Sequence, residues 1–158
     1  MPDIYQRLDA LGLTLPPPFV FPSNNRRGCV RSGPVLYLSG HGNGLPDWPG
    51  VIHRGKVGTD LTLDQAYAMA RIVALSMLST IHHGFGSLDR VTRVIRLMGL
   101  FNSAPGFVQQ TRAMDGASDL FYELWGPEHG QHARTAVGVA ELPFNIPVEI
   151  QGEFEVAA

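Results

Sequence analysis

The chain has 158 residues, of which 44% are hydrophobic and 16% are charged, and its formal net charge at pH 7 is -2. These values fit one globular domain with a buried core and exclude a disordered chain. The charge gives no general attraction to nucleic acid, and no apolar run is long enough to cross a membrane. The single cysteine, Cys29, excludes a disulfide within the chain and a cysteine-based metal cage, and it fits a reducing, cytoplasmic setting.

The N-terminal residues have the pattern of a short helix followed by a stiff connection. Apolar residues recur at helical spacing between residues 2 and 13, and three consecutive prolines follow. Proline cannot continue a helix, so the connection is expected to be extended. We therefore expect residues 1–18 to form an N-terminal helix with a proline-rich connection, and residues 19–158 to form a single domain.

The next segment carries the signals of a β-hairpin and then of a loop. Residues 29–31 and 35–39, which are mostly apolar, flank a Ser-Gly-Pro turn at 32–34, and this pattern predicts two short strands. Glycines and prolines are frequent at residues 40–49 and predict a loop. A short third strand is expected within residues 52–57.

Two long helices and three further strands are predicted for the rest of the chain. Thr62 and Gln65 have capping-box spacing, so we expect a helix from here to about His82, with a broad apolar stripe that packs across a sheet. The other predicted elements are a strand at 91–101, a helix at 113–125 that begins within residues 107–113, and strands at 134–142 and 148–156. This order of strands and helices is that of an α+β fold with a mixed sheet.

The most informative chemistry lies in the last two predicted strands. Arg134 stands in an otherwise apolar, alternating strand, and burying a guanidinium is costly unless acceptors meet its donors. Its planar fork suits a carboxylate, and the small residues Ala136 and Gly138 on the same face leave space for a ligand. Glu149, on the next strand, is a candidate acid or base. The alternatives are an interface salt bridge for Arg134 and an exposed strand carboxylate for Glu149.

Histidines and glycines supply weaker candidates. His41 follows a Ser-Gly corner, where a loop histidine could titrate near neutral pH or could simply be exposed. His129 and His132 flank the approach to Arg134, but no third ligand is evident, so we predict no metal site. The glycine-rich residues 40–44 follow a strand and do not open a helix, which argues against a phosphate-binding loop.

Two motifs resemble a known family. The sequence Ala-Arg-Thr-Ala-Val-Gly-Val-Ala-Glu-Leu-Pro at residues 133–143, followed by Val-Glu-Ile at 148–150, is similar to the C-terminal signature of the Rid family. These are the reactive intermediate (enamine/imine) deaminases, also called YjgF-like or L-PSP endoribonuclease-like proteins. Val-Arg-Ser-Gly at 30–33 and Leu-Tyr-Leu-Ser-Gly at 36–40 resemble the first hairpin of this family. The extra N-terminal helix resembles a longer subgroup.

The resemblance implies a chorismate-mutase-like α+β fold, with a mixed β-sheet, two long helices on one face, and a homotrimer that has three sites at its subunit interfaces. It implies hydrolytic deamination of a small imine or enamine that bears a carboxylate, with no metal or organic cofactor. Arg134 would hold the substrate carboxylate, and Ser39 would contribute to the pocket. Glu149, alone or together with His41, would orient or activate water.

The chain departs from the family pattern at pocket positions. Arg26 stands where the family has a tyrosine, His41 replaces a glutamine, Ala136 replaces a cysteine, and Ser118 maps to the asparagine of the second helix. Arg26 and Arg134 together could suit a dianion, or Arg26 could lie outside the pocket. Two other functions stay open. One is a non-catalytic trimer that binds a small carboxylate or a protein, and the other is RNA cleavage, against which the negative charge and the scattered arginines argue.

Overall fold

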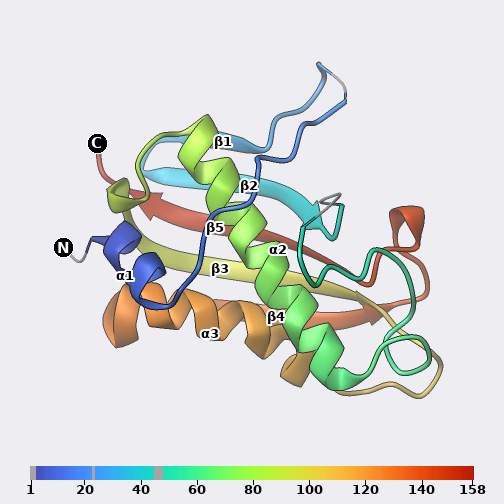
Figure 1. The fold of residues 1–158 in the computed structure, drawn as a ribbon. Coiled ribbons are helices and arrows are strands. Elements are labelled where there is room, and N and C mark those ends of the chain that lie inside the picture. Colours follow the sequence, from blue (N-terminus) through green and yellow to red (C-terminus); the bar gives the residue numbers. More distant parts are fainter. Residues whose placement is uncertain (1–2, 23, 45–47) are drawn as a thin grey trace.

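A five-stranded sheet, covered on one face by two long helices, forms the body of the protein (Figure 1). The computed structural model describes residues 3–22, 24–44 and 48–158. The strands are β1 (Cys29–Ser32), β2 (Val35–Gly42), β3 (Val91–Asn102), β4 (Ala133–Val139) and β5 (Val148–Val156). The α-helices are α1 (Ile4–Ala10), α2 (Leu63–Gly84) and α3 (Gln110–His129), and short 3-10 turns occur at η1 (Leu88–Arg90) and η2 (Pro143–Asn145).

The strand order is β1-β2-β5-β3-β4, and β4 forms one edge of the sheet. The β3–β4 pair is parallel, whereas the other neighbouring pairs are antiparallel, so the sheet is mixed. The expected α+β fold, with two long helices on one face of a mixed sheet, is therefore confirmed. The hydrophobic core lies between the sheet and these helices. The alternating apolar residues of β5 are buried there, whereas the residues between them are more exposed.

The α2 helix begins as the sequence predicts. The Thr62 hydroxyl accepts from the Gln65 amide at 3.1 Å, and the Gln65 side chain accepts from the Thr62 amide at 2.9 Å. These two bonds satisfy donors that the first turn leaves open. Further along, α2 approaches α3 so closely that a Cβ at Gly116 would overlap the Tyr67 carbonyl oxygen. A glycine is therefore required at this crossing.

The N-terminal helix packs against the same core as the sheet. Ile4 and Leu8 are buried in that core, and the Ile4 amide donates to Asp89 at 2.9 Å. The Arg7 guanidinium donates to the Leu124 carbonyl at 2.7 Å, which fixes α1 against α3. The boundary between an N-terminal segment and the main domain at residue 18 stays a prediction.

Three predictions of local structure need correction. The expected strand at 52–57 is absent, and only Val57 forms isolated bridges there. The expected loop at 40–49 starts too early, because β2 continues to Gly42; residues 45–47 of this loop lie outside the described residues. The expected strand at 134–142 is too long, because β4 ends at Val139 and the chain soon turns into η2.

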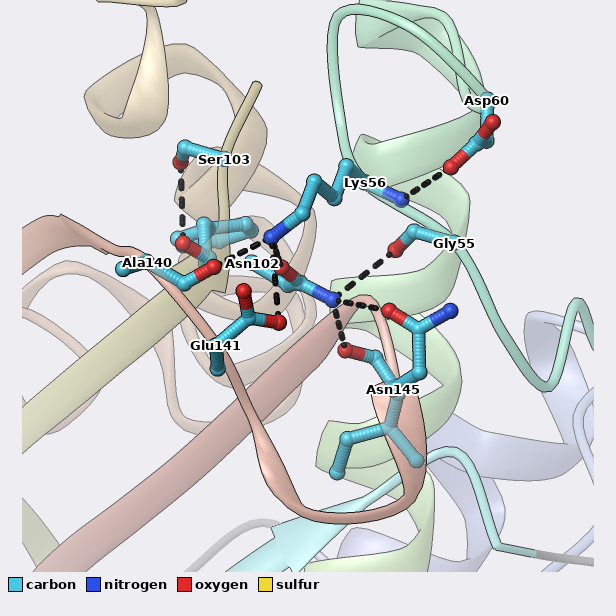
Figure 2. A network of polar contacts seen from close by, with 10 residues as sticks. Gly55, Lys56, Asp60, Asn102, Ser103, Ala140, Glu141 and Asn145 are labelled. Carbon is cyan, nitrogen blue, oxygen red and sulfur yellow. Dashed lines mark hydrogen bonds and ion pairs between the residues drawn. The ribbon is translucent and has the colours of Figure 1, made fainter. Parts of the chain in front are cut away.

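A polar network ties the far end of β3 to two loops (Figure 2). The buried Asn102 side chain accepts from Lys56 Nζ at 2.7 Å and donates to Asn145 Oδ1 at 2.8 Å. The Lys56 ammonium also donates to the Ala140 carbonyl and contacts Glu141. This network holds Phe144 and Asn145, which both have φ of 57°. Such left-handed backbone is unfavourable for a bulky residue, so the network maintains a strained turn. No helix in the described ranges is long and apolar enough to span a membrane.

Candidate functional site

Arg134 lies on the edge strand β4 and turns its side chain toward α3. Its Nη1 donates to Asp115 Oδ1 at 2.7 Å and to Ser118 Oγ at 3.1 Å, and its Nη2 donates to the Thr111 carbonyl at 3.2 Å. The Arg134 side chain is 20% exposed, so the ion pair with Asp115 is only partly screened by water. The guanidinium thus already has a carboxylate partner within its own chain.

Ser118 and His132 complete the surroundings of Arg134. His132 Nδ1 lies 2.7 Å from the Gly130 carbonyl oxygen and must carry the hydrogen, so Nε2 accepts from the Ser118 hydroxyl at 3.0 Å. Burial, followed by the charge of Arg134, lowers the pKa of His132, which favours this neutral form. A cavity of about 370 Å³ borders Arg134, Ser118 and His132, and it also reaches Tyr122.

Glu149 borders a second cavity, of about 250 Å³, which residues of β2 and η2 also line. It lies in β5 opposite Gly42 of β2 and Leu100 of β3, on the face that the helices leave open. Burial raises the pKa of the Glu149 carboxyl. Among the described residues, none donates a hydrogen bond to this carboxylate. A partly desolvated, unpaired carboxyl next to a cavity is typical of a group that handles protons.

His41 borders the same cavity, but its ring points into the protein. The register of β2 against β5 shifts between Leu38 and His41, and this bulge turns His41 to the helix side. Its Nδ1 donates to the Ser39 carbonyl at 2.6 Å, and its Nε2 accepts from the Thr80 hydroxyl at 2.7 Å. Burial lowers its pKa. The expectation of a loop histidine is therefore wrong: His41 is a buried strand residue with both nitrogens bonded.

Of the three remaining candidates, two border one of these cavities and one borders neither. Arg26 borders the Glu149 cavity and Ser118 borders the Arg134 cavity. The Ser39 hydroxyl donates to the Arg27 carbonyl at 2.6 Å and lines neither of these cavities. Arg26 and Arg134 consequently do not form a joint dianion site within one chain.

The Arg134 and Glu149 side chains lie on opposite faces of the sheet. Arg134 pairs in register with the buried Leu97 and faces the helices, whereas Glu149 faces away from them. One chain alone therefore cannot place a single small ligand against both side chains. No cluster of three or more potential metal ligands occurs in the part of the chain that the structure describes.

Sequence reasoning missed Asp115 and three aromatic residues. Asp115 lies one turn from both Thr111 and Ser118 on α3, so its helical spacing was a signal that it shares their face. Phe19 and Phe21, which precede β1, line the Glu149 cavity together with Phe144 of η2. No local pattern indicates that these two distant segments meet.

The chain resembles known proteins over almost its full length. Residues 6–150 match the family described as "YjgF/chorismate_mutase-like, putative endoribonuclease". Protein TCP17 of Trypanosoma cruzi is 41% identical over 150 residues, which are 94% of this chain and 91% of TCP17.

Two solved structures share the fold closely. The crystal structure of Atu1372, a protein of unknown function from Agrobacterium tumefaciens, matches with a TM-score of 0.86 and 36% identity, over 99% of this chain and 93% of that one. A "putative endoribonuclease" from Shewanella oneidensis MR-1 matches with a TM-score of 0.90 and 28% identity, over 98% of this chain and 100% of that one. These matches confirm the expected chorismate-mutase-like fold.

Proposed function

The chain belongs to the YjgF/chorismate mutase-like family, and from this premise we propose that it hydrolyses small carboxylate-bearing imines or enamines at sites shared between protomers of a homotrimer. The observation that carries the proposal is the Glu149 carboxyl, which is half-buried beside a cavity and has no donor partner among the described residues. No metal or organic cofactor takes part in this reaction scheme, and the single cysteine fits a cytoplasmic setting.

The proposed reaction uses Glu149 as a base and then as an acid. The ionised carboxylate takes a proton from water as the water oxygen adds to the carbon of the protonated imine, which gives a neutral carbinolamine. Glu149 then returns this proton to the nitrogen, and the C–N bond breaks to release ammonia. As the carbonyl acid forms, the hydroxyl proton passes to the carboxylate and from there to the released ammonia, which restores the ionised Glu149. Burial supports this role because it raises the pKa toward the working pH. We assign His41 to shaping the cavity floor, since both of its ring nitrogens are occupied.

Arg134 is proposed to bind the substrate carboxylate, supported by Ser118. Only Nη1 meets Asp115, so an incoming carboxylate would have to displace Asp115 or share the guanidinium with it. Ser118 is oriented by His132 so that its oxygen accepts from Arg134, which keeps the guanidinium in place. Ser39 is proposed to support the cavity indirectly, through its bond to Arg27.

The trimer is proposed because the two cavities of one chain cannot cooperate. A neighbouring protomer could place its edge strand β4, with Arg134, against the Glu149 cavity of the first protomer. A cyclic trimer with a heterologous interface would repeat this contact three times. The open face of the sheet carries the exposed apolar side chains of Val30, Tyr37 and Val137. Val30 and Tyr37 pair across β1 and β2, and Val137 lies on the opposite edge strand, so exposed apolar groups occur at both edges of the face that a partner would cover.

The test is ammonia release from freshly generated 2-imino acids. We expect Arg134→Ala and Glu149→Gln each to lower the rate by about 100-fold or more. Glu155→Gln is the matched control, because Glu155 lies on the same strand and the same face as Glu149 but lines neither cavity. Rates equal to those without protein would overturn the proposal.

The ion pair between Arg134 and Asp115 favours one other function, a non-catalytic trimer that binds a small acid or a protein. Binding of a carboxylate without any ammonia release, in protein with intact Glu149, would support it. RNA cleavage has no support from the net charge of -2. Nuclease activity that persists in Arg134→Ala and disappears on further purification would identify a contaminant.

A further inference from the structure

The glycine-rich stretch that follows the bulge in β2 forms the floor of the Glu149 cavity. Gly40, Gly42 and Gly44 all line this cavity, while the intervening His41 and Asn43 are buried. A Cβ on Gly40 would lie 2.9 Å from Cδ of Glu149, and a Cβ on Gly42 would overlap the Ile146 side chain. The alternating glycines therefore make room for a carboxyl and for apolar side chains, a role quite different from phosphate binding.

Aromatic residues between the proline run and β1 form one wall. The Phe19 and Phe21 rings meet edge to face with centroids 4.9 Å apart, and Phe21 meets the His41 ring in the same way at 6.0 Å. A Cβ on Gly28 would lie 2.9 Å from Cε2 of Phe21, so the glycine at this position leaves the space that the Phe21 ring occupies. These contacts fix the rings at the cavity rather than leaving them free on a loop.

The strained turn before β5 forms the opposite wall. Pro143, Phe144 and Ile146 all line the cavity. Phe144 is 85% exposed and has a φ of 57°, although an exposed phenylalanine gains nothing from such a conformation. Asn145, the next residue, is held by Asn102 at 2.8 Å. The fold thus maintains an aromatic side chain at the rim at some energetic cost, which indicates that the ring has a partner there.

We infer that this cavity selects substrates with an aromatic or branched apolar side chain, and the inference rests on the proposed deamination. Apart from Glu149 and Arg26, the lining residues carry no charge near neutral pH, because the pKa of His41 is lowered. The volume of about 250 Å³ is below the range of drug-sized sites and suits a molecule the size of an amino acid. An apolar substrate side chain would lie against the phenylalanines, with its reacting carbon near Glu149.

The direct test compares kcat/KM for imines generated by oxidation of phenylalanine, leucine and alanine. We expect the imines from phenylalanine and leucine to be preferred by at least 10-fold, as is typical when a large apolar group fills a pocket. Phe21→Ala should reduce this preference by about 10-fold. Val20→Ala is the matched control, because Val20 lies between the two phenylalanines, is 80% exposed and does not line the cavity. Equal rates for all three imines, or an unchanged preference in Phe21→Ala, would overturn the inference.

A binding measurement separates this inference from the proposed function. Calorimetry with phenylpyruvate and pyruvate needs no turnover, and we expect phenylpyruvate to bind at least 10-fold more tightly. If no imine is hydrolysed but this difference appears and is lost in Phe21→Ala, the deaminase proposal fails while the selectivity stands. If imines are hydrolysed without selectivity, the deaminase proposal stands and the selectivity inference fails. If neither hydrolysis nor selective binding is observed, both proposals are overturned. Should Phe21→Ala fail to fold, Phe144→Gly serves instead, because glycine accepts the positive φ and Phe144 is exposed.

Discussion

Replacement of Asn102 by alanine should destabilise the protein strongly, although the residue is small and lies at the end of β3. Its side chain accepts from Lys56 Nζ at 2.7 Å and donates to Asn145 Oδ1 at 2.8 Å, with longer contacts to the carbonyls of Ile146 and Gly55 at 3.2 and 3.4 Å (Figure 2). The residue is fully buried, so water cannot replace these bonds without opening the structure.

The magnitude follows from the number and kind of the bonds. A hydrogen bond to a charged group contributes about 1.5–3 kcal/mol and a neutral one about 1 kcal/mol. Lys56 keeps the Ala140 carbonyl and Glu141 as partners, which places its share at the lower limit. With two neutral donations lost as well, Asn102→Ala should lower the free energy of unfolding by about 3–4 kcal/mol.

Urea unfolding followed by circular dichroism measures this loss. For a domain of this size, a loss of 3–4 kcal/mol corresponds to a fall in Tm of about 10 °C. Asn24→Ala provides a control, because Asn24 is exposed. Asn102→Asp should be at least as damaging, since a carboxylate cannot donate to Asn145. A loss below about 1 kcal/mol in Asn102→Ala would refute the assignment of a stabilising role to this network.

Three further predictions concern titration and packing. Burial raises the pKa of Glu149, so ionisation of this carboxyl costs more in the folded state than in the unfolded chain. The free energy of unfolding of the wild type, relative to that of Glu149→Gln, should therefore fall as pH rises from 4 to 8. A difference between the two proteins that stays constant with pH in urea unfolding would contradict this. Burial lowers the pKa of His41, so as pH falls the unfolded chain takes up a proton on this ring before the folded protein does. The free energy of unfolding should therefore fall as pH drops below 6.5, the usual pKa of histidine, and it should fall less steeply in His41→Gln. Equal pH slopes of the unfolding free energy in the two proteins would argue against a buried neutral ring. Gly116→Ala should lower the free energy of unfolding by about 2–3 kcal/mol, because the new methyl group would overlap the Tyr67 carbonyl of α2. Thermal unfolding measures this loss, and an unchanged Tm would mean that α2 and α3 can move apart without cost.

Local patterns predicted most of the regular structure. The alternation from Val148 to Val156 matches β5, because one face of that strand is buried and the other is not. The capping box at Thr62 identified the start of α2, since its bonds involve residues only three apart. The expected helix at 113–125, with its start placed within residues 107–113, began as predicted, because α3 starts at Gln110. It was too short only at its C-terminal end, because the last turn continues through Pro127 after a non-helical Gly126.

The candidate site was harder to predict, because its geometry depends on register and on distant partners. His41 would share the face of Ser39 in a regular strand, and only the bulge turns its ring to Thr80. Arg134 was expected to await a ligand carboxylate, whereas Asp115 already meets it. The separation of Arg134 from Glu149 follows from the insertion of β3 between β4 and β5, which no periodicity in the sequence reveals.

The most direct test of a site shared between protomers is to co-express Arg134→Ala and Glu149→Gln chains and to measure ammonia release from the mixed assemblies. Each variant alone should be inactive. In random mixtures of a cyclic trimer, about a quarter of the interfaces would join an intact Arg134 to an intact Glu149 of the neighbouring protomer, so we predict recovery of about a quarter of the wild-type rate. Mixed trimers, verified by native mass spectrometry, that show no recovery would contradict the account.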